Sequence, residues 1–496
     1  RQLEPRFEPD AAVRQIAERL EGLPLALELA AARVKVLTPR QILERLNRSL
    51  DLLTAGAQDA PERQRTLRGT VEWSYRLLTA DEQRLFARLA VFTGSFVLEA
   101  AEAVSSAELD VLQSLVDKNL LRHGEDGRFF MLGTIKELAL EELRDLADAS
   151  SLRRRHDDYF LAVAEELDAR ERLSGMRDLG AESLNRFERE LPSFRAALAG
   201  LLEDGRREDV LRLGAALWRF WLNRAQYRDA ADWLESAPVD DANLPSGVRA
   251  AALAAAGGIA YYTHDDVDGA ERLWREGLEL QRVQDDPTEL GAALSRLASV
   301  AWRRGDIDGA IAYHKQALPL YERAGAEALL LTELHWLGDA YRDRGDYDEG
   351  ERVLQETATR ARECGLEQQL TSTLHSLGDL SLDRWDPDTA LQRFAEALDY
   401  AVATGSRRVQ IYCVAGIACA LLEQGDDRAA ARLWGIAEDQ ERRLGFRMLL
   451  NERQRYEQLI SGARERLGTA YQAERRAGPG LTLEQAVAEA RLHVPA

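Results

Sequence analysis

The stretch 334–361 reads LHWLGDAYRDRGDYDEGERVLQETATRA, and its pattern recurs along the second half of the chain. The segment DYDEG within it has counterparts every 40 residues, namely QYRDA, DVDGA, DIDGA, DPDTA and DDRAA, which end at residues 230, 270, 310, 390 and 430. Residue pairs such as LG at 337–338 recur upstream at the same interval. A fixed interval held through six copies predicts an array of stacked repeats.

Each copy is predicted to be two antiparallel helices joined by a tight turn. The small residue Gly338 allows the first helix to approach the second, and Tyr341 and Leu354 fill the space between them. Gly345 is expected to end the first helix in the left-handed conformation that glycine adopts easily. Strand signals are rare, whereas Ala, Leu, Arg and Glu dominate, so the sequence predicts a mainly α fold.

This pattern closely resembles the tetratricopeptide repeat over about 240 residues, with longer loops than the usual ~34-residue unit. The resemblance implies a right-handed superhelix whose concave wall is formed by the first helix of each repeat. Placing the family pattern on this sequence predicts the side chains that face a ligand groove. They are Tyr262, Ser299, Trp302, Arg303, Thr332, His335, Asp339, Arg342, Asp343, Ser372, His375, Asp379 and Asp383.

A polar wall with aromatic residues suits a protein, peptide or small-molecule ligand. Two His–Asp pairs, His335 with Asp339 and His375 with Asp379, are each one helical turn apart and can meet on one face. The alternative interpretation is a solvated face in which repeat similarity alone duplicates histidine and aspartate. No shared metal site is predicted, because equivalent positions in stacked repeats lie roughly 10 Å apart.

The composition excludes several classes of function. The chain has 496 residues, with 65 Lys and Arg against 85 Asp and Glu, for a formal net charge of −20. Such a chain does not attract nucleic acid or an anionic membrane at long range. Its three cysteines, Cys364, Cys413 and Cys419, have no CxxC spacing and favour neither a disulfide framework nor a zinc site. Without a signal peptide or a long apolar run, a cytoplasmic location is expected.

The first third of the sequence predicts a helical segment and then a second module. EGLPLALELAAARVKVL (21–37) indicates a corner between two helices, and AGAQDAPERQR (55–65) is typical of a linker. TADE (79–82) predicts a capping box. LLRHGEDGRFFML (120–132) predicts a β-hairpin around a Gly-Glu-Asp-Gly turn. Helices followed by such a hairpin are typical of a winged helix.

Several motifs in fixed order resemble the bacterial signal-transduction ATPases with numerous domains (STAND proteins), which are related to NB-ARC regulators. They are EGLPLALELAAARV, the stretch RTLRGTVEWSYRLLTADEQRLFARLAVFTGSFVLEAAEAV, SLVDKNLL and FMLGTIKELALEEL. The resemblance implies that Gly22, Leu23 and Pro24 lie near a nucleotide, ATP or ADP with Mg, held by an upstream phosphate-loop domain. The chain begins in mid-pattern and contains no GxxxxGK[ST], so we interpret it as a fragment without that domain.

These motifs predict five segments: a helical subdomain (1–57), a winged helix (66–147), a helical connector (148–209), repeats (210–462) and a C-terminal helical cap (463–496). The resemblance implies the regulatory and sensor half of a signalling ATPase or transcription regulator. In this hypothesis the repeats bind a ligand and the winged helix relays binding to an absent nucleotide-binding core. We predict no enzymatic activity for these residues, although the parent protein is expected to be an ATPase.

Two alternatives remain at the level of sequence: a passive helical scaffold and a DNA-binding regulator. The candidate recognition helix AELDVLQSLVDKNLL (107–121) carries Asp110 and Asp117 on its expected outer face, and Lys118 is its only cation. DNA-binding helices normally bring Arg or Lys to the phosphates. The sequence therefore predicts that direct nucleic-acid binding is not the role of this module.

Overall fold

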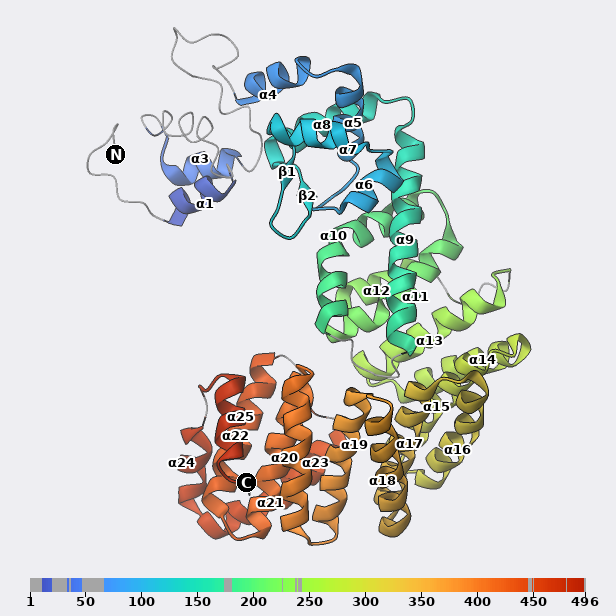
Figure 1. Cartoon of the computed structure of the whole chain (residues 1–496), viewed down its shortest axis with the longest axis vertical. Coiled ribbons are helices and arrows are strands. Elements are labelled where there is room, and N and C mark those ends of the chain that lie inside the picture. Colours follow the sequence, from blue (N-terminus) through green and yellow to red (C-terminus); the bar gives the residue numbers. More distant parts are fainter. Residues whose placement is uncertain are drawn as a thin grey trace. The chain divides into compact units, whose positions relative to one another are not determined.

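The computed structural model describes residues 11–19, 34, 37–46, 67–173, 181–224, 226–236, 239, 243–444, 448, 450–478 and 480–494. Nearly all of this described chain is helical, which confirms the predicted mainly α class (Figure 1). The chain divides into two compact units, one of residues 1–163 with 188–206 and the other of residues 164–187 with 207–496.

The first described elements are α1 (Ala11–Arg19) and α3 (Pro39–Leu46), which pack against each other and bury Ile16 and Ile42. Thr38 caps α3: its Oγ1 accepts from the Gln41 backbone N–H (3.4 Å), and the Gln41 side chain accepts from the Thr38 N–H (3.0 Å). The GLPL motif with Gly22, Leu23 and Pro24, and the expected linker at 55–65, lie outside the described residues.

A small module of helices and one hairpin follows. Its elements are α4 (Leu67–Arg76), α5 (Ala80–Leu89), α6 (Leu98–Ser105), α7 (Leu109–Asp117), β1 (Arg122–His123), β2 (Phe129–Phe130) and α8 (Gly133–Asp145). The predicted capping box is confirmed, because Thr79 and Glu82 exchange both of its hydrogen bonds at the start of α5. The hairpin is confirmed as a short antiparallel pair, and Phe96 adds a bridge to Phe129.

Two long helices follow this module, α9 (Ala149–Leu173) and α10 (Ala181–Glu203). A buried ion pair fixes the hairpin to α10: the Arg128 guanidinium donates to both Glu190 carboxylate oxygens at 2.6 and 2.9 Å. The side chains of both residues are less than a tenth exposed. A bidentate pair of this kind is shorter and stronger than an ordinary hydrogen bond.

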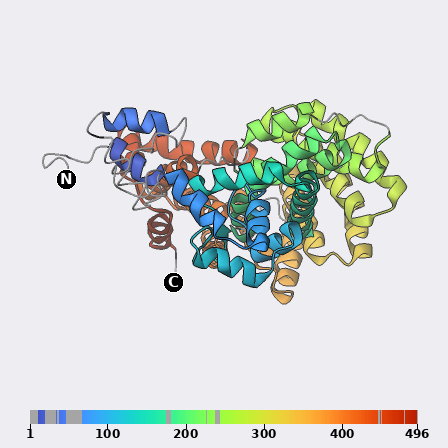
Figure 2. The same cartoon turned by 90° about the horizontal axis from the view of Figure 1, so that it is seen from above.

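The repeat array consists of helix pairs whose second helices begin at residues 227, 267, 307, 347, 387 and 427. The predicted period of 40 residues is thereby confirmed. The pairs are α11 (Arg207–Asn223) with α12 (Tyr227–Ser236), α13 (Ser246–Thr263) with α14 (Val267–Gln284), α15 (Pro287–Arg303) with α16 (Ile307–Ala324), α17 (Glu327–Arg344) with α18 (Tyr347–Glu363), α19 (Glu367–Asp383) with α20 (Pro387–Ala403), and α21 (Arg407–Glu423) with α22 (Asp427–Leu444). The succession of pairs can be followed in Figures 1 and 2.

Glycines make the close approach within each pair possible. A Cβ at Gly338 would lie 2.5 Å from Leu354, so only a residue without a side chain fits there. Gly378 on α19 and Gly416 on α21 both face the ring of Phe394, which is fully buried between them. Gly345 ends α17 at φ 91°, as predicted. The predicted roles of these glycines are therefore confirmed.

Three helices complete the chain: α23 (Leu450–Leu467), α24 (Thr469–Ala477) and α25 (Leu483–Arg491). Helices α24 and α25 pack on α22, and α25 also packs on α21. Tyr456, Ile460 and Ala463 of α23 are buried in the same apolar cluster as the last repeats. Their spacing of four and three residues is that of one helix face.

Candidate functional site

The residues predicted to line a groove lie on the first helices of successive repeats, α13, α15, α17 and α19. Five of them are buried: His335 and His375 are 8% exposed, and Asp339, Arg342 and Asp379 are 5%, 4% and 1% exposed. The prediction that these five side chains face an open groove is therefore wrong. They form the interior of a polar cluster to which α23, from the end of the chain, also contributes.

Helix α23 reaches α19 through two adjacent residues. The Tyr456 hydroxyl donates to Asp379 Oδ1 at 2.7 Å and lies 3.0 Å from His375 Nε2. The Arg455 guanidinium lies 2.9 Å from Asp379 Oδ1 and donates to Asp383 Oδ1 at 2.7 Å. It also donates to the main-chain carbonyl of Asp379 at 2.8 Å. The polar surface of α19 is thus occupied by side chains of this same chain.

Arg342 joins α17 to α19 from the other side. Its guanidinium lies 3.0 Å from Asp343, 3.3 Å from Asp379, 3.5 Å from Asp339 and 3.8 Å from Asp383. We call the whole set the inner-wall network; it comprises His335, Asp339, Arg342, Asp343, His375, Asp379, Asp383, Arg455 and Tyr456. Buried charges at these distances stabilise a fold only when each finds a partner, and this network supplies one.

Both predicted His–Asp pairs come together within the network. His335 Nε2 lies 3.6 Å from Asp339 Oδ2, and His375 Nδ1 lies 3.7 Å from Asp379 Oδ2. Burial lowers the pKa of His335 and outweighs the attraction of Asp339, so His335 is neutral at neutral pH. These distances exceed those of good hydrogen bonds, so the pairs act as neighbours in a charge network.

The carboxylates of the network are tuned in opposite directions. Burial alone would raise the pKa of Asp379, but the charges of Arg455, His375 and Arg342 prevail and hold it well below its ordinary value. For Asp383 burial prevails, and its pKa is raised although Arg455 and Arg342 oppose the shift. Asp379 is therefore the ionised centre on which the two guanidinium groups converge.

The remaining predicted residues lie at the margin of the network or apart from it. Trp302 Nε1 donates to Asp343 at 2.6 Å, and the Arg303 guanidinium pairs with Asp265. Ser299 and Thr332 donate to main-chain carbonyls four residues earlier in their own helices. Tyr262 and Ser372 are half-buried. The structure therefore brings together the α17 and α19 residues, with Trp302 at the edge, but not the whole predicted set.

Sequence reasoning missed four participants in the polar interior. The ring of His314 lies 2.7 Å from Glu333, which also accepts from Ser295 at 2.8 Å, and both His314 and Glu333 are buried. Arg455 and Tyr456 were assigned only to the end of the array. The amphipathic spacing of α23 indicated a packed helix, but nothing local indicated which carboxylates it would meet.

Within the described part of the chain, no group of three His, Cys, Asp or Glu side chains is arranged to hold a metal ion. No helix among the described residues is both long enough and apolar enough to cross a lipid bilayer.

The candidate DNA-recognition helix α7 uses its cation internally. Lys118, just after the helix, forms an ion pair with the buried carboxylate of Glu82, which also accepts from Ser114 at 2.5 Å. These hydrogen bonds from Lys118 and Ser114 lower the pKa of Glu82 to about 2. Gln113 donates to Asp117 at 2.8 Å. The face that would meet DNA is therefore acidic.

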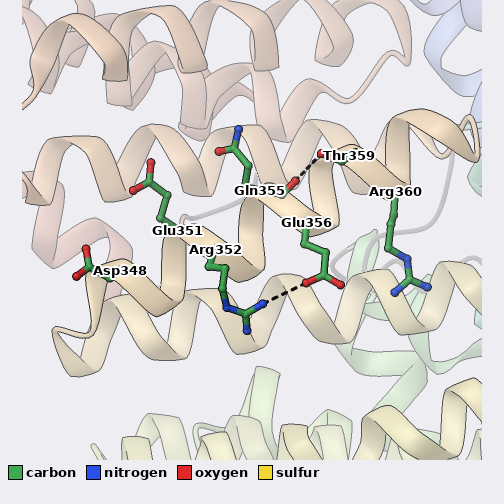
Figure 3. Close-up of a pocket in the computed structure, with 7 residues that line it drawn as sticks. All are labelled: Asp348, Glu351, Arg352, Gln355, Glu356, Thr359 and Arg360. Carbon is green, nitrogen blue, oxygen red and sulfur yellow. Dashed lines mark hydrogen bonds and ion pairs between the residues drawn. The ribbon is translucent and has the colours of Figure 1, made fainter.

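A shallow depression lies on the outer face of α18, lined by Asp348, Glu351, Arg352, Gln355, Glu356, Thr359 and Arg360 (Figure 3). Its charges are largely paired with one another or with neighbours: Arg352 lies 3.3 Å from Glu356, and Arg360 lies 2.9 Å from Glu327. We interpret it as a solvated, ion-paired helix surface, and none of the predicted site residues lines it.

Comparison with known proteins connects the two parts of the chain. Residues 290–324 match the tetratricopeptide repeat family. A Mycobacterium tuberculosis protein provisionally named an HTH-type transcriptional regulator is 35% identical over 302 residues, which cover 58% of this chain and 34% of that protein. An uncharacterized protein of the same organism is 37% identical over 156 residues, covering 29% of this chain and 39% of its own length. The chain thus spans between about a third and two fifths of the length of these relatives.

Among solved structures, the fold resembles the crystal structure of a STAND protein with a tetratricopeptide repeat sensor from Pyrococcus horikoshii. The TM-score is 0.51 at 15% identity, and the match covers 95% of this chain and 75% of that one. At this identity the likeness concerns the fold alone. It extends over nearly all of this chain.

Proposed function

We propose that this chain is the sensor and regulatory part of a STAND-type signalling protein or transcription regulator, whose nucleotide-binding core is supplied by residues outside the sequence. The observation that carries the proposal is a single fold likeness that spans 95% of the chain. The repeats would bind a protein, a peptide or a small ligand, and the helical module with the hairpin would act as a winged helix that relays binding.

A sensor needs an element with two arrangements whose balance a ligand can shift. The inner-wall network supports such a role, because α23 and the repeats are joined there by specific polar contacts as well as by apolar packing. A ligand that engages α17 and α19 would have to compete with Arg455 and Tyr456. The ligand site of the array would then be coupled to the position of its last helices.

The relay can be tested by hydrogen–deuterium exchange on the whole chain. In Arg455→Met, which removes the two aspartate contacts of α23, we expect faster exchange in α23 and a change of protection in α5 and α8 of the module. The matched control is Arg352→Met, whose side chain is 59% exposed on α18. A response confined to the array would contradict the relay and favour a passive scaffold.

The alternative of direct DNA binding follows from the names of the relatives and is opposed by the acidic surface of α7. We propose that this chain does not itself contact DNA and that any DNA-binding domain of the parent lies elsewhere. A mobility-shift assay with random-sequence duplex at low salt tests this, because non-specific binding is strongest there. A shift lost in Lys118→Gln would overturn the proposal.

The nucleotide-proximal role of Gly22, Leu23 and Pro24 is likewise a proposal. If most of the nucleotide contacts come from an upstream phosphate-loop domain, calorimetry of this chain with ATP or ADP and Mg should show no tight binding. Submicromolar affinity would contradict the half-switch hypothesis.

A further inference from the structure

The turns between the two helices of each repeat share one backbone conformation, and one of them carries an unexpected residue. Position φ values are 77° at Gly305, 91° at Gly345 and 87° at Gly425, whereas the equivalent residue of the fifth repeat is Trp385, with φ 62°. Its N–H donates to the carbonyl three residues earlier at 2.9 Å, as the N–H groups of Gly305 and Gly345 do. Glycine therefore satisfies this turn without the strain that a bulky side chain brings.

The side chain of Trp385 does not compensate for this strain by packing. The residue is 75% exposed, whereas Trp221 and Trp233 of the same array are buried. A large, rigid aromatic surface held outward on a turn is the kind of residue that anchors protein interfaces. The fold gains nothing from it that we can identify, so the structure favours a role in recognition.

A depression of about 660 Å³ lies next to this residue in the chain. It is lined by Gly345, Asp346, Tyr347, Asp348 and Glu349 of the fourth repeat and by Arg384, the neighbour of Trp385. Arg384 is held across it, because its guanidinium pairs with Asp348 and lies 3.3 Å from Glu351. The two consecutive turns, 345–349 and 384–388, thus share one surface, which we call the turn edge.

The charge of the turn edge indicates the chemistry of its partner. Asp346, Asp348, Glu349, Asp386 and Asp388 supply five carboxylates in these two turns, and Arg384 supplies the one guanidinium. Asp386 caps α20 through the Thr389 N–H, and Asp388 accepts from Gln424 at 2.7 Å, so both have fixed positions. Lysine and arginine side chains are attracted both to carboxylates and to the faces of tryptophan and tyrosine rings.

We propose that the turn edge, with Trp385 as its aromatic anchor, is a docking surface for a basic segment of a partner protein. A guanidinium or ammonium group enters beside Tyr347 and the carboxylates, and the indole of Trp385 packs over the aliphatic part of the segment. This surface is separate from the inner-wall network, and its occupation does not depend on the function proposed above.

The test uses a fluorescein-labelled octapeptide of alternating Arg and Gly, titrated with the whole chain at physiological salt and followed by anisotropy. We expect binding that weakens at least tenfold in Trp385→Gly and falls further as salt is raised. Because glycine suits the turn, Trp385→Gly should also have a higher Tm than the wild type, which separates loss of binding from loss of folding. A peptide with Glu in place of Arg should not bind.

Val283→Ala is the matched control, since Val283 is another exposed apolar residue, 82% exposed on α14, and lies outside the turn edge. Equal affinity of Trp385→Gly and Val283→Ala for the peptide would overturn the proposal, because binding would then reflect the overall negative charge alone. Concentration-dependent dimerisation of the wild type that Trp385→Gly abolishes would also overturn it, because the occupant would then be a second copy of this chain.

Discussion

Replacing Asp379 by asparagine tests whether the inner-wall network holds α23 in place. Asp379 is 1% exposed and receives the Tyr456 hydroxyl at 2.7 Å and the guanidinium groups of Arg455 at 2.9 Å and Arg342 at 3.3 Å. Asparagine keeps the size of the side chain but removes the charge, so it leaves two buried cations short of a partner. Breaking a buried ion pair in this way costs about 3–5 kcal/mol.

The matched control is Asp308→Asn. Asp308 also pairs with an arginine, Arg344, at 2.8 Å, but its side chain is 81% exposed. An exposed pair contributes about 0–1 kcal/mol, so the two variants should differ by at least about 2 kcal/mol in the free energy of unfolding. Urea unfolding followed by circular dichroism measures this difference. Hydrogen exchange of α23 should locate it, since protection reports local opening. If the two variants are equally stable and α23 exchanges as in the wild type, the reasoning is refuted.

The pH dependence gives an independent check of the same prediction. The pKa of Asp379 is lowered in the folded chain, so its ionised form stabilises the fold above the ordinary aspartate pKa of about 4. That contribution is lost as the pH falls below this value, because the folded chain must then take up a proton at an unfavourable site. The gap in stability between the wild type and Asp379→Asn should therefore be full at pH 7 and shrink as the pH falls from 4 toward 2.

Three further changes follow from other parts of the structure. Phe394→Ala should lower the free energy of unfolding by about 3–5 kcal/mol in urea, because the fully buried ring packs against glycines of two helices and leaves a cavity; Phe130→Ala, at 37% exposure, should cost far less. Glu190→Gln should destabilise the first unit by several kcal/mol, since it leaves the buried Arg128 guanidinium without its anion, and thermal unfolding of this variant alongside Glu188→Gln measures it. Burial lowers the pKa of Lys136 to about 8 against 10.5 in the unfolded chain, so the stability of the wild type relative to Lys136→Met should rise between pH 8 and 10; a flat difference would contradict this.

The repeat architecture could be predicted because its determinants are local and recur. Gly345 marks the end of a helix, and Gly338 marks the close approach of two helices. The period of 40 residues follows from comparing each copy with the next. All three features are confirmed, since each depends on backbone conformation and on contacts within one pair. The capping box at Thr79 was predictable for the same reason.

The accessibility of the site could not be predicted in the same way. A repeat pattern says which residues of the first helices face inward, and it placed His335 and Asp379 correctly on that face. It does not say what covers them, because the covering residue Arg455 lies 76 positions after Asp379 and belongs to no repeat motif. Contacts of this range depend on how the array ends, and that information is not periodic.

Equivalent positions in the array therefore acquire different roles through their surroundings. Asp339 and Asp379 are separated by one period, yet Asp379 receives Arg455 and Tyr456 whereas Asp339 accepts from Ser376 at 3.1 Å. Likewise the turn that holds Gly305 or Gly345 elsewhere holds the exposed Trp385 in the fifth repeat. Because the period maintains the scaffold at every copy, the departures from it stand out as the positions whose residues the scaffold does not require. For this reason we expect recognition to depend on Trp385 and on the residues that α23 covers more than on the residues that all repeats share.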